Sequence, residues 1–259
     1  MLFNNVNSIH YESTLLKVRD DAFSIREIGT LRFENAAVQV KAQGKNDCLL
    51  LYLRSGHAIV KHAKSEKVIL SNELVLIPLE NGVHFLYAQG SGDFLVGTNC
   101  PQTELMRNHL RVPSQIDPRH FDEFLLSCLD PMVSESLSKL LKALPVNTNR
   151  DVKQRDFIRN ALLFMDKNIS KRIVLDDITD TIDYSKFHFI RVFDEYIGQT
   201  PHQYICDRRL FLARELLAET DLPISEVALR SGIRFTSNFY SHFKRKFKKT
   251  PKDFRDQSE

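Results

Sequence analysis

The chain has 259 residues, of which 42% are apolar and 27% are charged, and a formal net charge of +3. These values are typical of a folded protein with one large domain or two ordinary ones. We expect no secretory signal, because residues 1–16 lack a basic start and an apolar core. We expect no membrane-spanning helix, because the longest apolar runs have about six residues where roughly twenty are needed. The four cysteines (Cys48, Cys100, Cys128 and Cys206) are not at metal-ligand spacing, which favours free thiols in a reducing cytoplasm.

Short β-prone runs dominate the first hundred residues. They cover residues 48–63, 67–78 and 82–99 and are separated by glycine, asparagine and proline turn signals. Several strands at this spacing indicate a small barrel or sandwich. No run of strand length alternates with a long helix here, which argues against an α/β domain.

Helical periodicity replaces the strand pattern after residue 120. Apolar residues mark one face of residues 121–129 and, after Pro131, one face of residues 133–144. These two amphipathic helices either pack on the β-rich domain or pair with a second copy in a dimer. Residues 145–151 are polar and show no periodicity, so they are predicted to be a linker.

Basic charge is concentrated near the C-terminus. Residues 227–252 hold eight Lys and Arg residues and no Asp or Glu. Such a patch is either a solvated helix face or a binding surface for a polyanion. Phe239, Phe243 and Phe247 recur every fourth residue among these cations, so the segment is predicted to be a helix with one apolar and one basic face.

An internal repeat organises the C-terminal region. Residues 193–201 align with 243–251, and residues 175–179 align with 224–228. Each copy predicts a short helix, a turn and a longer helix, which is a helix-turn-helix pattern. The predicted N-caps of the longer helices are Ser185 and Ser237, and the predicted turn residues are Asp183 and Gly232.

A helix of about twenty residues, starting at Thr200 and Pro201, joins the two copies and spans on the order of 30 Å. It is predicted to bury Ile205, Leu212, Ala213 and Leu216. One turn of DNA is roughly 34 Å long, so this helix could set two recognition helices in successive major grooves.

With this repeat, the chain resembles the AraC/XylS family of bacterial transcription regulators. The resemblance is carried by ARELLAETDLPISEVALRSGI (213–233), by SNFYSHFKRKFKKTPKDFR (237–255) and by the weaker first copy at 185–210, and it covers about residues 155–255. Two residues depart from the family pattern, since Lys248 replaces a glycine and Ile233 replaces a phenylalanine. Neither departure removes a DNA-facing residue, and Lys248 adds charge. SGHAIVKH followed by ELVLIPLENGVHF is more loosely similar to the family's cupin-like regulatory domain.

The resemblance implies an α+β protein of two domains. An N-terminal β-rich, cupin-like barrel is followed by two helices, and the C-terminal all-α domain holds two helix-turn-helix units joined by a long helix. The implied boundaries are 1–112 for the regulatory domain, 113–145 for a helical dimerisation segment, 146–151 for a linker and 152–259 for the DNA-binding domain, with helix-turn-helix units at about 175–196 and 224–247.

The resemblance also assigns DNA contacts. The family's base-contacting positions fall here on Phe187, Ile190, Arg191, Ser237, Asn238 and Ser241, and phosphate contacts are expected from Ser185, Lys186, Lys244, Arg245, Lys248 and Lys249. Arg191 can bond guanine with two donors, and Phe187 can pack on a thymine methyl group. Phe187 could instead be a core residue, but Phe189 and Phe193 already form the apolar stripe of this helix.

The implied function is sequence-specific regulation of transcription in a bacterial cytoplasm, with activation the commoner outcome in the family and RNA polymerase as a partner. The N-terminal domain would bind a small effector, such as a fatty acid or another carboxylate, and Lys17, Arg19 and Lys41 are the cationic candidates. A regulatory protein could control the chain instead, and a homodimer is the expected assembly if the apolar helices pair. No cofactor or metal is expected.

A cupin-type enzyme is the remaining alternative. His57 and His62 are five residues apart, so on one strand they would face opposite sides of the sheet. The chain has no His-x-His pair and no Gly-x-Ser-x-Gly nucleophile motif. We therefore expect no enzymatic activity.

Overall fold

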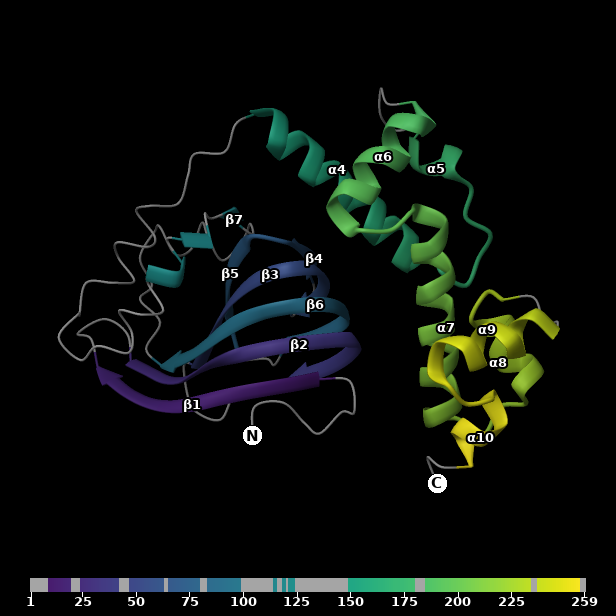
Figure 1. The fold of residues 1–259 in the computed structure, drawn as a ribbon, viewed down its shortest axis with the longest axis horizontal. Helices are drawn as coiled ribbons and strands as arrows, with labels where there is room; N and C mark the ends of the chain where they lie inside the picture. Colours follow the sequence, from purple (N-terminus) through teal and green to yellow (C-terminus); the bar gives the residue numbers. More distant parts are fainter. Residues whose placement is uncertain are drawn as a thin grey trace. The chain divides into compact units, whose positions relative to one another are not determined.

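The computed structural model describes residues 9–19, 24–41, 47–62, 65–79, 83–98, 114–115, 118–119, 121–123, 149–179, 185–233 and 237–256 (Figure 1). The chain divides into two compact units, Met1–Arg159 and Asn160–Glu259. The division falls inside helix α4 (Asn149–Lys167) and not in the predicted linker of residues 146–151. The last three residues of that linker belong to α4, because a polar first turn carries no apolar periodicity that would mark the start of a helix.

The N-terminal unit is built on a curved antiparallel sheet (Figure 1). Its strands are β1 (Ile9–Arg19), β2 (Ser24–Val40), β3 (Asp47–His62), β4 (Ser65–Leu70), β5 (Glu73–Pro78), β6 (Val83–Thr98) and β7 (Ser114–Gln115). They follow the order β1-β2-β6-β3-β5-β7, and β4 pairs with β3. The three predicted β-prone runs correspond to β3 through β6, so the β-rich character of this region is confirmed.

Strand β3 is buried on both faces. Leu49, Leu51 and Leu53 point to one face and join the main hydrophobic cluster. Tyr52 points to the other face and is also fully buried, with its ring centroid 4.3 Å from that of Phe121. A strand covered on both faces needs apolar residues at consecutive positions, which explains the unbroken apolar run of residues 48–53. The helices predicted at 121–129 and 133–144 lie outside the described residues, except for the helical residues 121–123.

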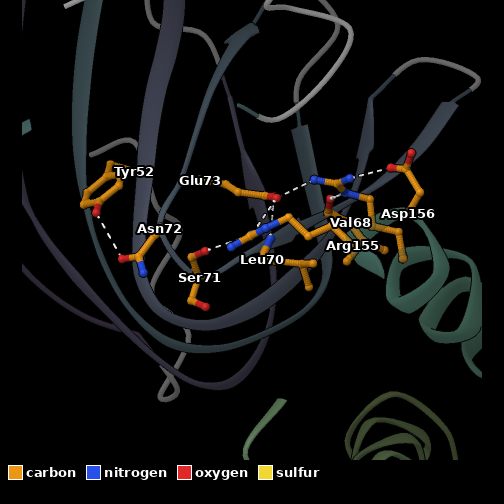
Figure 2. A network of polar contacts seen from close by, with 9 residues as sticks. Tyr52, Val68, Leu70, Ser71, Asn72, Glu73, Arg155 and Asp156 are labelled. Carbon is orange, nitrogen blue, oxygen red and sulfur yellow. Dashed lines mark hydrogen bonds and ion pairs between the residues drawn. The ribbon is translucent and has the colours of Figure 1, made fainter. Parts of the chain in front are cut away.

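A buried ion cluster joins the start of α4 to the β4–β5 turn (Figure 2). The Glu73 carboxylate is fully buried and accepts bonds from the Leu70 N–H at 2.8 Å, from Arg155 at 3.0 Å and from Arg159. Arg155 also donates to the Ser71 carbonyl at 3.2 Å. Burial raises the pKa of Glu73, whereas Arg159, the Leu70 N–H and Arg155 lower it. The pKa of Glu73 is raised on balance, so the paired guanidinium groups offset only part of the cost of burying this carboxylate, and they attach α4 to the sheet.

The C-terminal unit is helical and contains the repeat that the sequence indicates. After α4 come α5 (Leu175–Thr179), α6 (Lys186–Ile197), α7 (Pro201–Glu219), α8 (Ile224–Arg230), α9 (Ser237–Phe247) and α10 (Pro251–Arg255). The helix α7 connects the α5–α6 pair to the α8–α9 pair (Figure 1). The two copies therefore form two helix-turn-helix units, and the 19 residues of α7 span about 28 Å.

Matched capping confirms that the two copies are structural repeats. Thr200 caps α7 by accepting a bond from the Gln203 N–H, and Thr250 caps α10 by accepting one from the Asp253 N–H. In each copy the residue after Thr is a buried proline at the first helical position. Ser185 is the N-cap of α6, as predicted, because its hydroxyl accepts a hydrogen bond from the His188 N–H.

The buried face of α7 differs from the predicted stripe. Ile205 and Ala213 are buried as expected, but Leu212 and Leu216 are only half-buried. The fully buried residues of α7 include Tyr204, Leu210, Phe211 and Leu217. Since α7 packs against a different helix-turn-helix unit at each end, its two halves bury different faces, and no single 3.6-residue stripe describes the whole helix.

Gly232 allows close packing at the turn of the second unit. Its φ of +78° is left-handed, as predicted, and a Cβ atom there would lie 2.6 Å from the Ile169 carbonyl oxygen. No side chain fits at that distance. The turn between α8 and α9 therefore packs directly on the residues that follow α4. This contact fixes the second helix-turn-helix unit against the segment that leads from α4 to the first one.

Candidate nucleic-acid interface

Helix α6 separates a buried apolar face from an exposed face. Phe189, Val192 and Phe193 are buried, and the Phe193 ring packs edge-on against Tyr204 of α7 at 5.7 Å. Phe187 points away from this core and is 86% exposed. Among the described residues it is the most exposed large hydrophobic side chain.

The other predicted contact residues of α6 lie around Phe187. Arg191 is exposed, and its Nη2 lies 3.5 Å from His188 Nδ1, which is a long contact that leaves the guanidinium accessible. Ile190 is half-buried and offers less surface. Lys186 pairs with Asp176 of α5 at 2.5 Å, but both side chains are about half exposed, so this ion pair is weak and can exchange for a phosphate.

Helix α9 repeats this division of faces. Phe239 and Phe243 are fully buried against Leu210, Ala213 and Leu217 of α7 and Val227 and Ala228 of α8. Asn238 and Ser241 are exposed. Ser237 is the first residue of α9 and not the residue before it; its side chain is outside the described part of the structure. The exposed face of α9 is small and polar where that of α6 carries Phe187 and Arg191.

The cations of α9 and the following turn have different surroundings. Lys244 and Arg245 of α9 are exposed, on the same side as Asn238 and Ser241 in the helical periodicity. Lys248 and Lys249 follow the end of α9 and are also exposed. Lys246 differs from them, because it pairs with Asp207 of α7 and lies 5.4 Å from the centre of the Phe211 ring. It therefore attaches α9 to α7.

Lys248 has an unusual backbone conformation. Its φ is +64°, and its N–H donates to the Lys244 carbonyl at 2.8 Å. In the first copy the equivalent residue is Gly198, with a φ of +75° and the same type of bond to Asp194. A left-handed conformation is unfavourable by about 1–2 kcal/mol for a residue with a Cβ atom, and this penalty is absent for glycine. The second copy thus keeps a strained lysine at a position where glycine fits.

The candidate effector residues are not brought together by what the structure describes. Lys41 is exposed just after β2, and the side chains of Lys17 and Arg19 on β1 lie outside the described residues. His57 and His62 both belong to β3. Within the described ranges, no three His, Cys, Asp or Glu side chains are placed to hold a metal ion. In the same part of the chain no helix has the length and apolar content to cross a membrane.

Comparisons with known proteins find relatives of the helical part of the chain. A family model described as a helix-turn-helix domain matches residues 178–257. The regulatory protein SoxS of Escherichia coli K12 is 33% identical over 98 residues, which are 38% of this chain and 92% of SoxS. The probable transcriptional regulator LumQ of Photobacterium leiognathi is 29% identical over 126 residues, which are 47% of this chain and 51% of LumQ.

A solved structure is similar over a comparable share of the chain. The transcriptional regulator with an AraC-type DNA-binding domain from Chromobacterium violaceum is 29% identical, covers 41% of this chain and 96% of its own, and has a TM-score of 0.39. The chain spans about half or less of the length of several other regulators that it matches.

Proposed function

The chain belongs to the AraC/XylS family of transcription regulators, and we propose from this premise that α6 and α9 bind two successive major grooves of double-stranded DNA. The length of α7, about 28 Å, supports this spacing, because one turn of DNA is roughly 34 Å. Arg191 is proposed to read a guanine and Phe187 to pack on a thymine methyl group, with a smaller contribution from Ile190. Ser237, Asn238 and Ser241 contact bases with less discrimination.

The observation that carries the proposal is the exposed face of α6, where Phe187 and Arg191 project opposite a complete core. A phenylalanine with 86% exposure has no structural role on a solvated surface, but it fits a groove lined by methyl groups. The exposed cations around α9 are proposed to contact phosphates, together with Ser185 and Lys186 of the first unit. Phosphate contacts position a protein on DNA and make its affinity depend on salt.

Selection from random duplexes of about thirty base pairs by the full chain tests this function. The enriched sequences should contain two short motifs whose centres are about one helical turn, roughly ten base pairs, apart. Anisotropy titrations with the selected duplex should then show affinity falling steeply between 50 and 200 mM salt. An unenriched pool, or an affinity that does not change with salt, would contradict the proposal.

Replacing Arg191 by alanine should relax base preference at one position of the first motif. The expected loss is about 1–3 kcal/mol of discrimination, because a guanine loses a two-donor contact. Competition titrations against duplexes with each base at that position measure it. Arg245→Ala is the matched control, since an exposed arginine proposed to contact phosphate should weaken binding to all four duplexes equally. Equal weakening by Arg191→Ala would remove its assignment as a base contact.

Replacing Lys248 by glycine should have opposite effects on stability and on binding. Relief of the left-handed strain should stabilise the free protein by about 0.5–1 kcal/mol, after the entropy cost of glycine is included. Loss of one phosphate contact should lower DNA affinity about fivefold at 0.15 M salt. Thermal unfolding and anisotropy measure the two effects. Lys249→Gly is the control, because Lys249 lacks a positive φ and should weaken binding without stabilising the protein.

The N-terminal unit is proposed to regulate DNA binding. In this proposal it binds a small effector, such as a fatty acid or another carboxylate, or mediates dimerisation, and the chain acts as an activator that contacts RNA polymerase. Control by a protein partner is the alternative. Mass spectrometry of protein purified without refolding distinguishes them, since a co-purifying lipid or sugar supports the small-molecule effector. The relatives are named as regulators, which supports a regulatory and not an enzymatic role.

A further inference from the structure

A cavity of about 510 Å³ that is open to solvent lies at the surface of the C-terminal unit. It is formed by four segments: the residues that follow α4, the middle of α7, the α8–α9 turn with the end of α8, and α9. A volume of this size is in the usual range for small-molecule sites, about 300–1,000 Å³. It is separate from the proposed base contacts Phe187, Arg191, Asn238 and Ser241, none of which lines it.

The charges that line the cavity are all of one sign. Lys171, Arg172 and Arg209 contribute cations and His242 contributes an imidazole, and no Asp or Glu is among the lining residues. Arg209 is fixed in place, because its Nε donates to the Ile169 carbonyl at 2.9 Å and its Nη2 to the Lys171 carbonyl at 2.6 Å. These partners are uncharged, and burial lowers the pKa of Arg209. Among the described residues, its positive charge is therefore held at the wall by carbonyl groups and not by a carboxylate.

The rest of the lining is apolar and includes an exposed leucine. Ile173, Leu210 and Ile233 contribute apolar surface. Leu229 of α8 also lines the cavity and is 65% exposed. A cavity with cations on one part of its wall and apolar side chains on the other is complementary to a ligand with an anionic group and an apolar body.

We infer that this cavity is a binding site for a small organic anion, a molecule with one carboxylate, sulfonate or phosphate group on an apolar body. The guanidinium of Arg209 and the neighbouring Lys171 and Arg172 bind the anionic group, and Leu229 with Ile233 covers the apolar body. The site belongs to the helical unit, so it is distinct from the effector site proposed for the N-terminal unit. It includes the α8–α9 turn and His242 of α9, so an occupied site would stiffen the second helix-turn-helix unit.

Cys206 gives a local readout of occupancy, because it lines the cavity as a free, half-buried thiol. The full chain is treated with N-ethylmaleimide, and alkylation of the Cys206 peptide is followed by mass spectrometry. The probe is 8-anilino-1-naphthalenesulfonate, an apolar ring system with one sulfonate. At ten times its dissociation constant it should slow the alkylation of Cys206 about tenfold, by mass action. N-phenyl-1-naphthylamine, which has the same rings without the charge, should protect much less.

Two glutamate substitutions on α8 form a matched pair. Leu229→Glu places a negative charge at the cavity and should weaken binding of the sulfonate probe about tenfold. Ser225→Glu makes the same change of charge at an exposed residue that does not line the cavity, and should leave protection intact. Three outcomes would overturn the inference. The sulfonate could protect Cys206 equally in the two variants, or the neutral amine could protect Cys206 as well as the sulfonate does. Duplex DNA could also protect Cys206 where the sulfonate does not. The last outcome would assign these cations to the DNA backbone and would leave the proposed DNA binding standing.

Discussion

Glu73→Ala should destabilise the N-terminal unit by about 3–5 kcal/mol, because it leaves Arg155 and Arg159 buried without their shared carboxylate. Both arginines also bond backbone carbonyls of the β4–β5 region, so they cannot move into water without breaking those bonds. Hydrogen exchange of the full chain measures the effect. Amides of β4 and β5 should lose protection by about 150-fold to 5,000-fold, since each 1.36 kcal/mol corresponds to a factor of ten.

Asp156→Ala is the control for this prediction. Asp156 pairs with the same Arg159 at 2.6 Å, but its side chain is 56% exposed. An exposed pair contributes about 0–1 kcal/mol, so the protection of β4 and β5 should change less than tenfold. Amides of α9 serve as an internal reference in both variants, since α9 belongs to the other unit. A loss of protection in Glu73→Ala no larger than in Asp156→Ala would show that the buried cluster does not hold α4 to the sheet.

This cluster marks a limit of prediction from sequence. Local pattern identifies β3 through β6, because β-prone runs and turn signals are short-range features. Glu73 appears in the sequence only as an acid at the start of an apolar run, and its arginine partners are 82 and 86 residues away. The pairing of β2 with β6 likewise joins Ser24 to Thr98. Contacts at such separations depend on the whole fold and leave no local periodicity.

More of the candidate interface than of the sheet could be predicted from the sequence, because the repeat supplies an internal alignment. The stripe of Phe189 and Phe193 sets the core face of α6, and this orientation already places Phe187 outside, where the structure has it. The same alignment places Lys248 opposite Gly198, which is the signal for its left-handed backbone. The sequence does not separate Lys246 from the neighbouring lysines, since only the position of Asp207 on α7 distinguishes it. The cavity also lacks a motif, because its lining comes from four separate segments.

The triple variant K244A/R245A/K249A removes three cations of the second helix-turn-helix unit together. It should weaken DNA binding about 100-fold at 0.15 M salt. Each phosphate contact releases counterions and contributes about 0.9 to the slope of log affinity against log salt, so the slope should become shallower by about 2.7. The relative preference among base sequences should stay the same, because these side chains are proposed to contact phosphates and not bases. Anisotropy titrations at four salt concentrations, with the selected duplex and a scrambled one, measure both quantities.

A second triple variant, R32A/K61A/K153A, removes the same net charge from exposed positions of the N-terminal unit. If the second helix-turn-helix unit contacts phosphates directly, this control should change the slope by much less than one, because the slope reports phosphate contacts and none is assigned to these three side chains. Equal slopes in the two variants would mean that net charge alone, and not the basic face of α9, determines the affinity. A large loss with an unchanged slope would instead mean that the three side chains act through the fold of α9. Only a shallower slope with retained sequence preference assigns phosphate contact to Lys244, Arg245 and Lys249, and it leaves base recognition to Arg191 and the small polar residues of α9.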